Sequence, residues 1–578
     1  MSSATEGRPD GRTVPAETLA LREATRALRL HLDILPIDFD LDTEPERFIA
    51  GLAFVSARQR YACAESLIGA GFGGTALGSL CRGLFADALR WLWIGADERR
   101  LLLLSGDLLL ERSRLCTTLT DSNCSCPNFR RWLEPIAGLL PIVDALLPEA
   151  WAMPSENALL ADFLATQASR PSGDESLLAR AEQLLSGAEL RGAALIAAHV
   201  GHGNYLGLQS SLSDDGAVGH DLRLDHEALY LQLGAAGAVA TAIGSSAVAD
   251  HWWPGEYERD QFLDVALALA SEVSRRALDV HRLLGRRGRT GTPSSHAVPE
   301  SFAPNPSATS SPPPLWPAAP YPQTVIDVAE TYYALARSLP IDPWGRAEPT
   351  LHPLLGWTGA LSNLESVFAT YDQTGAGPIV VSAARALLEE AARTHWRYSV
   401  SDPSAFRARA TQFFDKFRAR RRKTINLLVG GGVPREDAEG FFALPTAVDP
   451  ATITTDPTPG RLRIPSISEM LVNLGTGYPE PSWMLVAYSL LSQATHATPL
   501  GLMYSLSVRS DGQLNSGEIM NELLALSLDI TCASSSVVLG VSALTLTDLS
   551  PEAWRYQEQL QLASLRVHDA ARLVHGLD

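Results

Sequence analysis

The stretch Tyr488–Leu502 has a second, gapless counterpart in the middle of the chain, at Ala194–Leu208. When the two are aligned, His202 falls on His496, and both stretches end in Leu-Gly-Leu. A second pair of segments recurs in the same order. Two matching blocks in one order predict an internal duplication, so the fold must be one that two similar units can build.

The second repeated block is Arg82–Trp93, which aligns with Arg385–Trp396. Arginine, an acidic residue, arginine and tryptophan recur at identical spacing in the two copies, and a glycine-containing break precedes each. The apolar residues of both copies follow the helical period. We therefore expect one charged helix in each half, followed later in each half by a helix that carries a histidine.

Runs of alternating β-branched residues are almost absent, so the periodicity predicts an all-α chain of two homologous helical bundles. The expected organisation is a disordered tail at 1–15, a bundle at 16–287, a Pro/Ser-rich linker at 288–322 and a second bundle at 323–578. The linker is predicted because its proline-rich composition cannot sustain a helix and has little to bury. Near its end, the chain places Ser550 before Pro551, which predicts a helix that starts there.

The net charge of −18 over 578 residues argues against a general binder of nucleic acid or anionic membranes. Six cysteines in a chain of this length do not form a disulfide framework, and the polar N-terminus resembles no signal peptide, so we expect a cytoplasmic protein. The uncharged stretch Leu229–Ala249 is long enough to span a bilayer. Its Ala, Gly and Ser content favours a tightly packed buried helix instead, so no membrane association is expected.

Arg385 and Glu389 stand four residues apart on the predicted charged helix, which places them on one face within salt-bridge reach. One interpretation is structural: the pair holds two helices together. The other is functional: the arginine is a fixed cation for a phosphate or another anion, and the histidine of a facing helix is its partner.

The pattern Arg385, Glu389, Trp396, then Tyr488, Ser492 and His496 resembles uncharacterised actinobacterial helical proteins that are distantly similar to HEPN-like domains. The resemblance implies a helical bundle, often dimeric or duplicated, and in some relatives metal-independent RNA cleavage. It covers the second half best. Arg82 and His202 form a degenerate copy in the first half, where Ala86, Ala194 and Ala198 replace the glutamate, tyrosine and serine.

The HEPN nucleases carry an arginine and a histidine separated by four to six residues on one helix. Arg276 and His281 fit this spacing, as do Arg26 and His31, but neither pair lies in the repeated blocks. So short a pattern is expected by chance in an arginine-rich chain. A helical fold of this kind does not therefore imply nuclease activity.

A histidine-rich region in the first half could hold a metal ion through His199, His202, Asp225 and His226. His199 and His202 stand at i, i+3, a spacing that can ligate a metal. Only His202 has a counterpart in the second half, so a metal is not a property of the shared fold. The alternative is that these histidines are structural or solvent-exposed.

The segment Arg407–Lys423 holds the chain's one concentration of positive charge. The default interpretation is a solvated helix face, and the alternatives are RNA or nucleotide phosphate, or the acidic surface of a partner protein. A homo-oligomer also fits the sequence. No fingerprint for a dinucleotide, a P-loop or a nucleophile elbow is present, and no cofactor is expected.

The sequence therefore leaves three hypotheses open. The first is a HEPN-like protein with an RNA- or nucleotide-directed role in defence or stress, its site formed by Arg385, Glu389 and His496. The second is a non-catalytic interaction scaffold in which these residues only hold helices together. The third is a metal-dependent enzyme that uses the first-half histidines.

Overall fold

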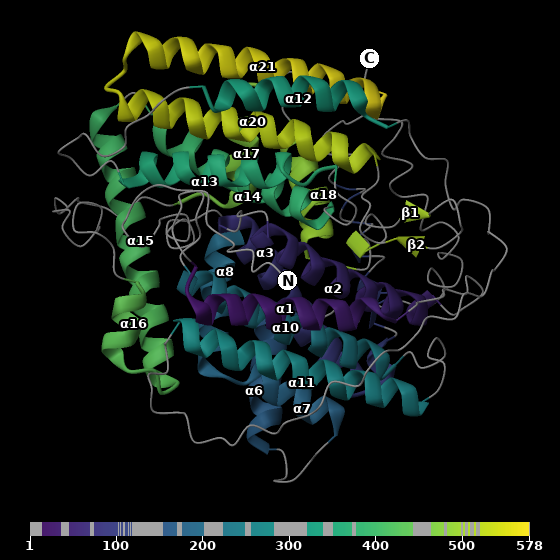
Figure 1. Cartoon of the computed structure of the whole chain (residues 1–578). Helices are drawn as coiled ribbons and strands as arrows, with labels where there is room; N and C mark the ends of the chain where they lie inside the picture. Colours follow the sequence, from purple (N-terminus) through teal and green to yellow (C-terminus); the bar gives the residue numbers. More distant parts are fainter. Residues whose placement is uncertain are drawn as a thin grey trace, which may run out of the picture.

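The protein is described from a computed structural model (Figure 1). The described residues are 14–35, 45–69, 74–101, 154–169, 176–201, 224–248, 256–281, 321–338, 351–372, 377–400, 402–442, 464–478, 482–496 and 521–576, with scattered positions at 103–117 and 498–515. Most of the predicted tail and most of the predicted linker lie outside these residues.

The described part of the chain is all-α, as predicted, apart from one short antiparallel pair, β1 (Ser507–Val508) and β2 (Leu514–Asn515). The first half contains α1 (Ala16–Asp33), α2 (Pro45–Gly69), α3 (Gly74–Gly95), η1 (Glu98–Leu101), α6 (Glu156–Ser169), α7 (Leu177–Leu185), α8 (Ala188–Gly201), α10 (Leu224–Ser246) and α11 (Glu256–His281). The second half contains α12 (Gln323–Ala336), α13 (Leu351–Phe368), α14 (Gly377–Tyr398), α15 (Pro403–Gly430), α16 (Arg435–Phe441), α17 (Ile467–Gly475), α18 (Trp483–Thr495), α20 (Asn521–Leu546) and α21 (Pro551–His575).

Each half is built around one long buried helix, α10 in the first half and α20 in the second. Helix α10 packs against α3, α2, α11 and α1, and α20 packs against α14, α13, α21 and α12. These neighbours occur in the same chain order in the two halves. The arrangement is the one that a duplication predicts, although the duplication itself remains a prediction.

Helices α10 and α20 are long and apolar enough to cross a membrane by length and composition. Neighbouring helices bury all of the apolar window in α10 and 89% of that in α20. Two glycines of α10 allow it to pack closely against α3. A side chain at Gly237 would lie 2.7 Å from the Leu84 backbone, and one at Gly244 would clash with the Trp91 backbone. Helices α3 and α10 therefore meet backbone to backbone.

The last helix begins as predicted. The Ser550 side chain accepts a hydrogen bond from the Ala553 backbone N–H at 3.2 Å, and Pro551 occupies the first turn. Gly576 then ends α21 in the left-handed conformation, with φ of 67°. Both ends of this helix thus use the residue types that satisfy its free backbone groups.

The two halves meet where α3 packs against α14 and α13, and α15 and α16 add a second connection. At the start of α15, the Arg409 guanidinium lies 4.8 Å from the Trp396 ring of α14, within the second half. Further along, the Leu428 side chain packs against Gly192 of α8, in the first half. Figure 1 shows α15 running along one side of the molecule from the second half to the first, with α16 at its far end.

Candidate functional site

Helices α14 and α18 bring together four of the residues that the sequence singles out. The Arg385 guanidinium forms an ion pair with Glu389 at 2.9 Å, one turn further along α14. Its Nε donates to the Ser492 hydroxyl of α18 at 3.1 Å, and its guanidinium carbon lies 5.6 Å from the centre of the Tyr488 ring. The predicted convergence of the arginine helix with the later helix is thus observed for these side chains.

The Glu389 carboxylate is the centre of this network. Its second oxygen accepts from Arg393 at 2.6 Å, and its first oxygen also accepts from the Tyr488 hydroxyl at 3.3 Å. The side chain of Glu389 is only 2% exposed and that of Arg385 only 5%. One buried carboxylate therefore serves two guanidinium groups, and this arrangement fixes the orientation of both arginines.

His496 lies at the C-terminal end of α18, where its backbone N–H donates to the Ser492 carbonyl at 3.0 Å. It follows Ser492 by one turn, so Tyr488, Ser492 and His496 share the i, i+4, i+8 spacing of one helix face. The residue is half-buried. The predicted histidine thus stands at the end of the face that Arg385 contacts.

The same end of α18 is in contact with the first half through Arg60 of α2, a residue that the sequence analysis did not identify. Arg60 donates to the Ala494 carbonyl at 2.8 Å and pairs with Asp87 of α3 at 3.0 Å. Burial raises the pKa of Asp87 to about 6, and the charge of Arg60 opposes that shift. The hydrogen bond from Arg60 to Ala494 therefore links the two halves next to His496, and the buried ion pair with Asp87 holds Arg60 in place.

Of the degenerate copy in the first half, the described residues include Arg82 but not His202. Arg82 forms an ion pair with Glu156 of α6, a partner that the repeat does not predict. Ala86 stands on α3 at the position that aligns with Glu389, so no equivalent of the Arg385–Glu389 pair forms. His202 lies outside the described residues, and its position relative to Arg82 stays a prediction.

Two of the four predicted metal ligands are described with their side chains. The Asp225 carboxylate accepts the His226 backbone N–H at 2.9 Å, at the start of α10. The His226 ring is buried and stacks on the Phe441 ring of α16, with centroids 4.5 Å apart and planes 6° apart. The side chain of His199 and all of His202 lie outside the described part. Within that part, no group of three or more His, Cys, Asp or Glu residues could hold a metal ion.

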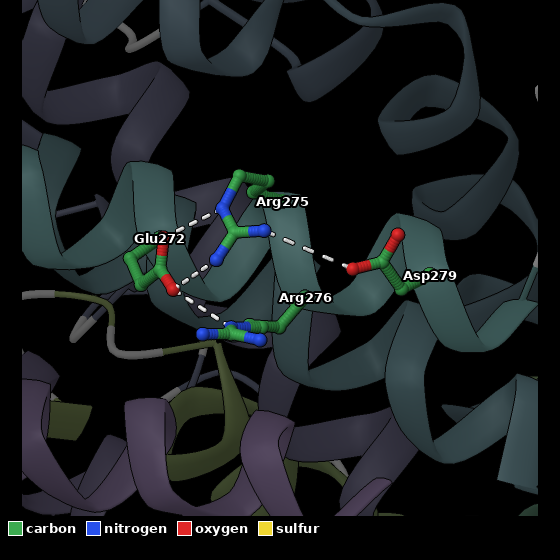
Figure 2. Close-up of polar contacts among 4 residues, drawn as sticks. All are labelled: Glu272, Arg275, Arg276 and Asp279. Carbon is green, nitrogen blue, oxygen red and sulfur yellow. Dashed lines mark hydrogen bonds and ion pairs between the residues drawn. The ribbon is translucent and has the colours of Figure 1, made fainter. Parts of the chain in front are cut away.

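The arginine–histidine pairs with HEPN-like spacing do not form shared sites. Figure 2 shows Arg276 on α11 with Arg275, both paired with Glu272; Arg276 Nε lies 2.7 Å from Glu272, and Arg275 also faces Asp279 at 3.8 Å. His281 instead is buried, 3.0 Å from the Gln232 side chain of α10.

The side chains of the other pair with this spacing, Arg26 and His31, also lie in different surroundings. Arg26 is exposed on α1, whereas the His31 ring stacks on Phe262 with centroids 4.3 Å apart. In both pairs the arginine is on the outer face of its helix and the histidine packs inward.

A buried polar cluster that the sequence analysis missed joins α20 to α18 and α21. The Asp529 carboxylate accepts from the Trp483 indole N–H at 2.8 Å, and the same oxygen lies 2.9 Å from His568 Nδ1. Burial lowers the pKa of nearby His575 to about 4, so this imidazole is neutral at pH 7. In each half, then, a histidine of the last helix bonds a side chain of the central helix, His281 with Gln232 and His568 with Asp529.

The basic run on α15 is exposed over much of its length. Its described cations are Arg409, Lys416, Arg418, Arg420, Arg421, Arg422 and Lys423, and four of them, Lys416, Arg420, Arg422 and Lys423, are exposed. Arg418 lies 3.5 Å from Asp415. The side chains of Phe413, Phe414 and Phe417, predicted to mark the buried face, lie outside the described part.

No protein-family model, curated protein or solved structure matches the chain. The resemblance to HEPN-like domains therefore remains an expectation, and the site itself must carry the functional argument.

Proposed function

We propose that the chain is a HEPN-like helical protein with an RNA- or nucleotide-directed role in defence or stress, and that the phosphates of its ligand bind at α15. The observation that carries the proposal is the continuity of positive charge from α14 to α15. Arg393 shares Glu389 with Arg385, and its charge acts on both Lys416 and Arg420 of the basic run. The candidate site and the basic helix thus adjoin.

The net charge of −18 makes the cluster of positive charge on α15 unusual for this protein. In an acidic protein, carboxylates are abundant, yet Lys416, Arg420, Arg422 and Lys423 have no ion-pair partner in the described part of the chain. Clustered cations attract phosphate by Coulomb interaction and by release of counterions from the nucleic acid. A polyanion is the ligand class that such a surface favours.

Direct binding tests this proposal. A fluorescently labelled single-stranded RNA is titrated with the wild-type protein and with a basic-run variant, Arg421→Ala/Arg422→Ala/Lys423→Ala, and its anisotropy is measured. The matched control is Arg26→Ala/Arg180→Ala/Arg555→Ala, which removes the same charge from α1, α7 and α21. We expect the basic-run variant to lose at least about tenfold in affinity and the control to keep it. Equal losses in the two variants would refute the proposal, and no binding by the wild type would refute RNA as the ligand.

A second candidate function, a non-catalytic scaffold, is favoured by the burial of the Arg385–Glu389 pair. This ion pair within α14 is buried where α18 packs against it, so it can serve only to hold the two helices together. His496→Ala separates the two functions. If His496 serves as an acid or base, the variant loses RNA cleavage or ligand binding with little change in melting temperature. If the residue is structural, the variant melts at a lower temperature and there is no activity to lose.

A further inference from the structure

Helix α21 carries the largest group of exposed apolar side chains in the described part of the chain. Trp554 is 53% exposed, Leu562 55% and Leu573 68%. Figure 1 shows α21 at the edge of the molecule, and its main contacts are with α20 and α12 on its inner side. Large apolar side chains gathered on one outer face are typical of an interaction surface.

Leu562 lies at the centre of this outer face. Ala553 and Ala571 are both fully buried, and each stands nine residues from Leu562, which is about two and a half helical turns. The Leu562 side chain therefore points directly away from the core. It also lies close to the middle of the helix, which runs from Pro551 to His575.

The corresponding helix of the first half has no such face. Helix α11 packs against the central helix α10 as α21 packs against α20. Among the described side chains of α11, those that are exposed are all polar, namely Gln261, Asp264, Ser271 and Arg275. The apolar face of α21 is therefore specific to this helix and does not follow from how the last helix of each half packs.

The charges of α21 are arranged as opposites about Leu562. Each glutamate, aspartate and arginine of the helix has a residue of opposite charge at the same distance on the other side of Leu562. The pairs, at four, seven and ten residues from Leu562, are Glu558 with Arg566, Arg555 with Asp569, and Glu552 with Arg572. An antiparallel copy of the helix, related by a two-fold axis at Leu562, would therefore bring each charge to the level of an opposite charge.

We propose that the outer face of α21 is the interface of a homodimer, in which two copies of this helix pack antiparallel about a two-fold axis at Leu562. Leu562 meets its own copy at the centre, and Glu558 of each chain faces Arg566 of the partner subunit. Neither Glu558 nor Arg566 forms an ion pair or a hydrogen bond within the described part of the chain, so both are available for this contact. The inference does not depend on what the protein binds.

The composition of the helix favours a second copy over an anionic membrane surface. A helix that lies on such a membrane has a polar face rich in lysine and arginine. Helix α21 instead has three acidic residues and three arginines. One helix face per chain is a small interface, so we expect a dissociation constant on the order of 10 µM.

Reversing the charges at Glu558 and Arg566 tests the interface in the intact protein. Sedimentation velocity is measured from about 1 to 200 µM, a range that spans the expected dissociation constant. Glu558→Arg and Arg566→Glu each place like charges at both contacts, so each variant should weaken dimerisation at least about tenfold. The combined variant Glu558→Arg/Arg566→Glu restores opposite charges and should dimerise within about threefold of the wild type.

Recovery in the combined variant can arise only from contact between chains. Within one helix the two residues are about 12 Å apart along the axis and form no ion pair. The matched control is Glu23→Arg, which makes the same change of charge at an exposed position of α1 and should leave dimerisation unchanged. Glu558 and Arg566 are both exposed, so all variants should keep the melting temperature of the wild type.

Cysteine cross-linking tests the position of the two-fold axis. Leu562→Cys brings its own copy within reach of a disulfide, whereas the two copies of Leu573→Cys would be about 33 Å apart along the paired helices. After mild oxidation, Leu562→Cys should give a linked dimer on a non-reducing gel, well above the background of the wild type, and Leu573→Cys should not.

Three results would overturn the inference. The first is a wild type that stays monomeric over the whole concentration range. The second is a combined variant that dimerises no better than the single reversals. The third is equal cross-linking of Leu562→Cys and Leu573→Cys, which would place the contact elsewhere.

Discussion

Glu389 and Glu390 are adjacent and both buried, yet replacing each with glutamine should have opposite effects. Glu389 bonds two guanidinium groups, at 2.9 Å and 2.6 Å. For Glu390, the largest influence is desolvation, which raises its pKa from an ordinary 4.5 to about 8 against the opposing charges of Arg393 and Arg397. The first carboxylate is stabilised by its partners, and the second is kept mostly neutral at pH 7 by its surroundings.

The pKa of Glu390 sets the sign and size of the effect. Because its folded pKa is raised, the folded state binds the proton more tightly than the unfolded state. Its contribution to stability is then fully present below pH 4.5 and is lost as the pH rises to about 8. The difference between the two pKa values corresponds to about 5 kcal/mol at 25 °C. Glu390→Gln has no proton to lose, so its stability relative to the wild type should rise over this range by up to that amount.

Denaturant unfolding of wild type, Glu390→Gln and Glu389→Gln at several pH values between 4.5 and 8.5 measures this difference. Glu390→Gln should match the wild type at pH 4.5 and exceed it increasingly towards pH 8. Glu389→Gln should be less stable by roughly 3 kcal/mol at pH 7, because it leaves two partly buried guanidinium groups facing a neutral amide. A pH-independent difference between Glu390→Gln and wild type would refute the reasoning about burial.

Two further substitutions test how the halves are joined. Arg60→Ala leaves the Asp87 carboxylate buried without its cation and removes the bond to the Ala494 carbonyl, so unfolding should become easier by about 3–5 kcal/mol, measured in urea at pH 7. Phe441→Ala removes the ring that stacks on His226 and should cost about 3–5 kcal/mol. Hydrogen exchange should then accelerate in α16 and not in α12; unchanged exchange in α16 would contradict the role of this contact.

The helical class and the charged network were predictable because both depend on local spacing. The 3.6-residue period identifies the helices, and Arg385 and Glu389 pair because i, i+4 residues share a helix face. The functional interpretation predicted that the histidine helix faces Arg385, with His496 as its partner. The two helices do meet, but the contacts of Arg385 with Ser492 and Tyr488 were not predicted.

The partners of other charged residues could not be predicted, because they depend on how helices pack. Arg60 gives no local signal: it pairs with Asp87 when α2 packs on α3, and it bonds the end of α18 only when the two halves pack together. Asp529 looks like an isolated charge in an apolar helix, yet it bonds Trp483 and His568 from two other helices. A buried acidic residue in such a helix was the available signal for a polar cluster.

Aligned residues also differ where their neighbours differ. Arg82 aligns with Arg385, but Ala86 removes the acidic residue on its own helix, and the arginine pairs with Glu156 of α6 instead. The arginine–histidine spacing at Arg276 and His281, which the sequence analysis attributes to chance, forms no shared site, because five residues along a helix turn the two side chains to different faces. Spacing alone did not show which face was buried.

The dependence of RNA binding on salt tests the central claim most directly, since that claim is that phosphates bind the cations of α15. Affinity for single-stranded RNA is measured by anisotropy between 50 and 200 mM KCl, for the wild type and for Arg421→Ala/Arg422→Ala/Lys423→Ala. Each phosphate contact contributes about −0.7 to the slope of log affinity against log salt concentration, so the variant should have a slope shallower by up to about 2. Equal slopes for the two proteins would contradict the account.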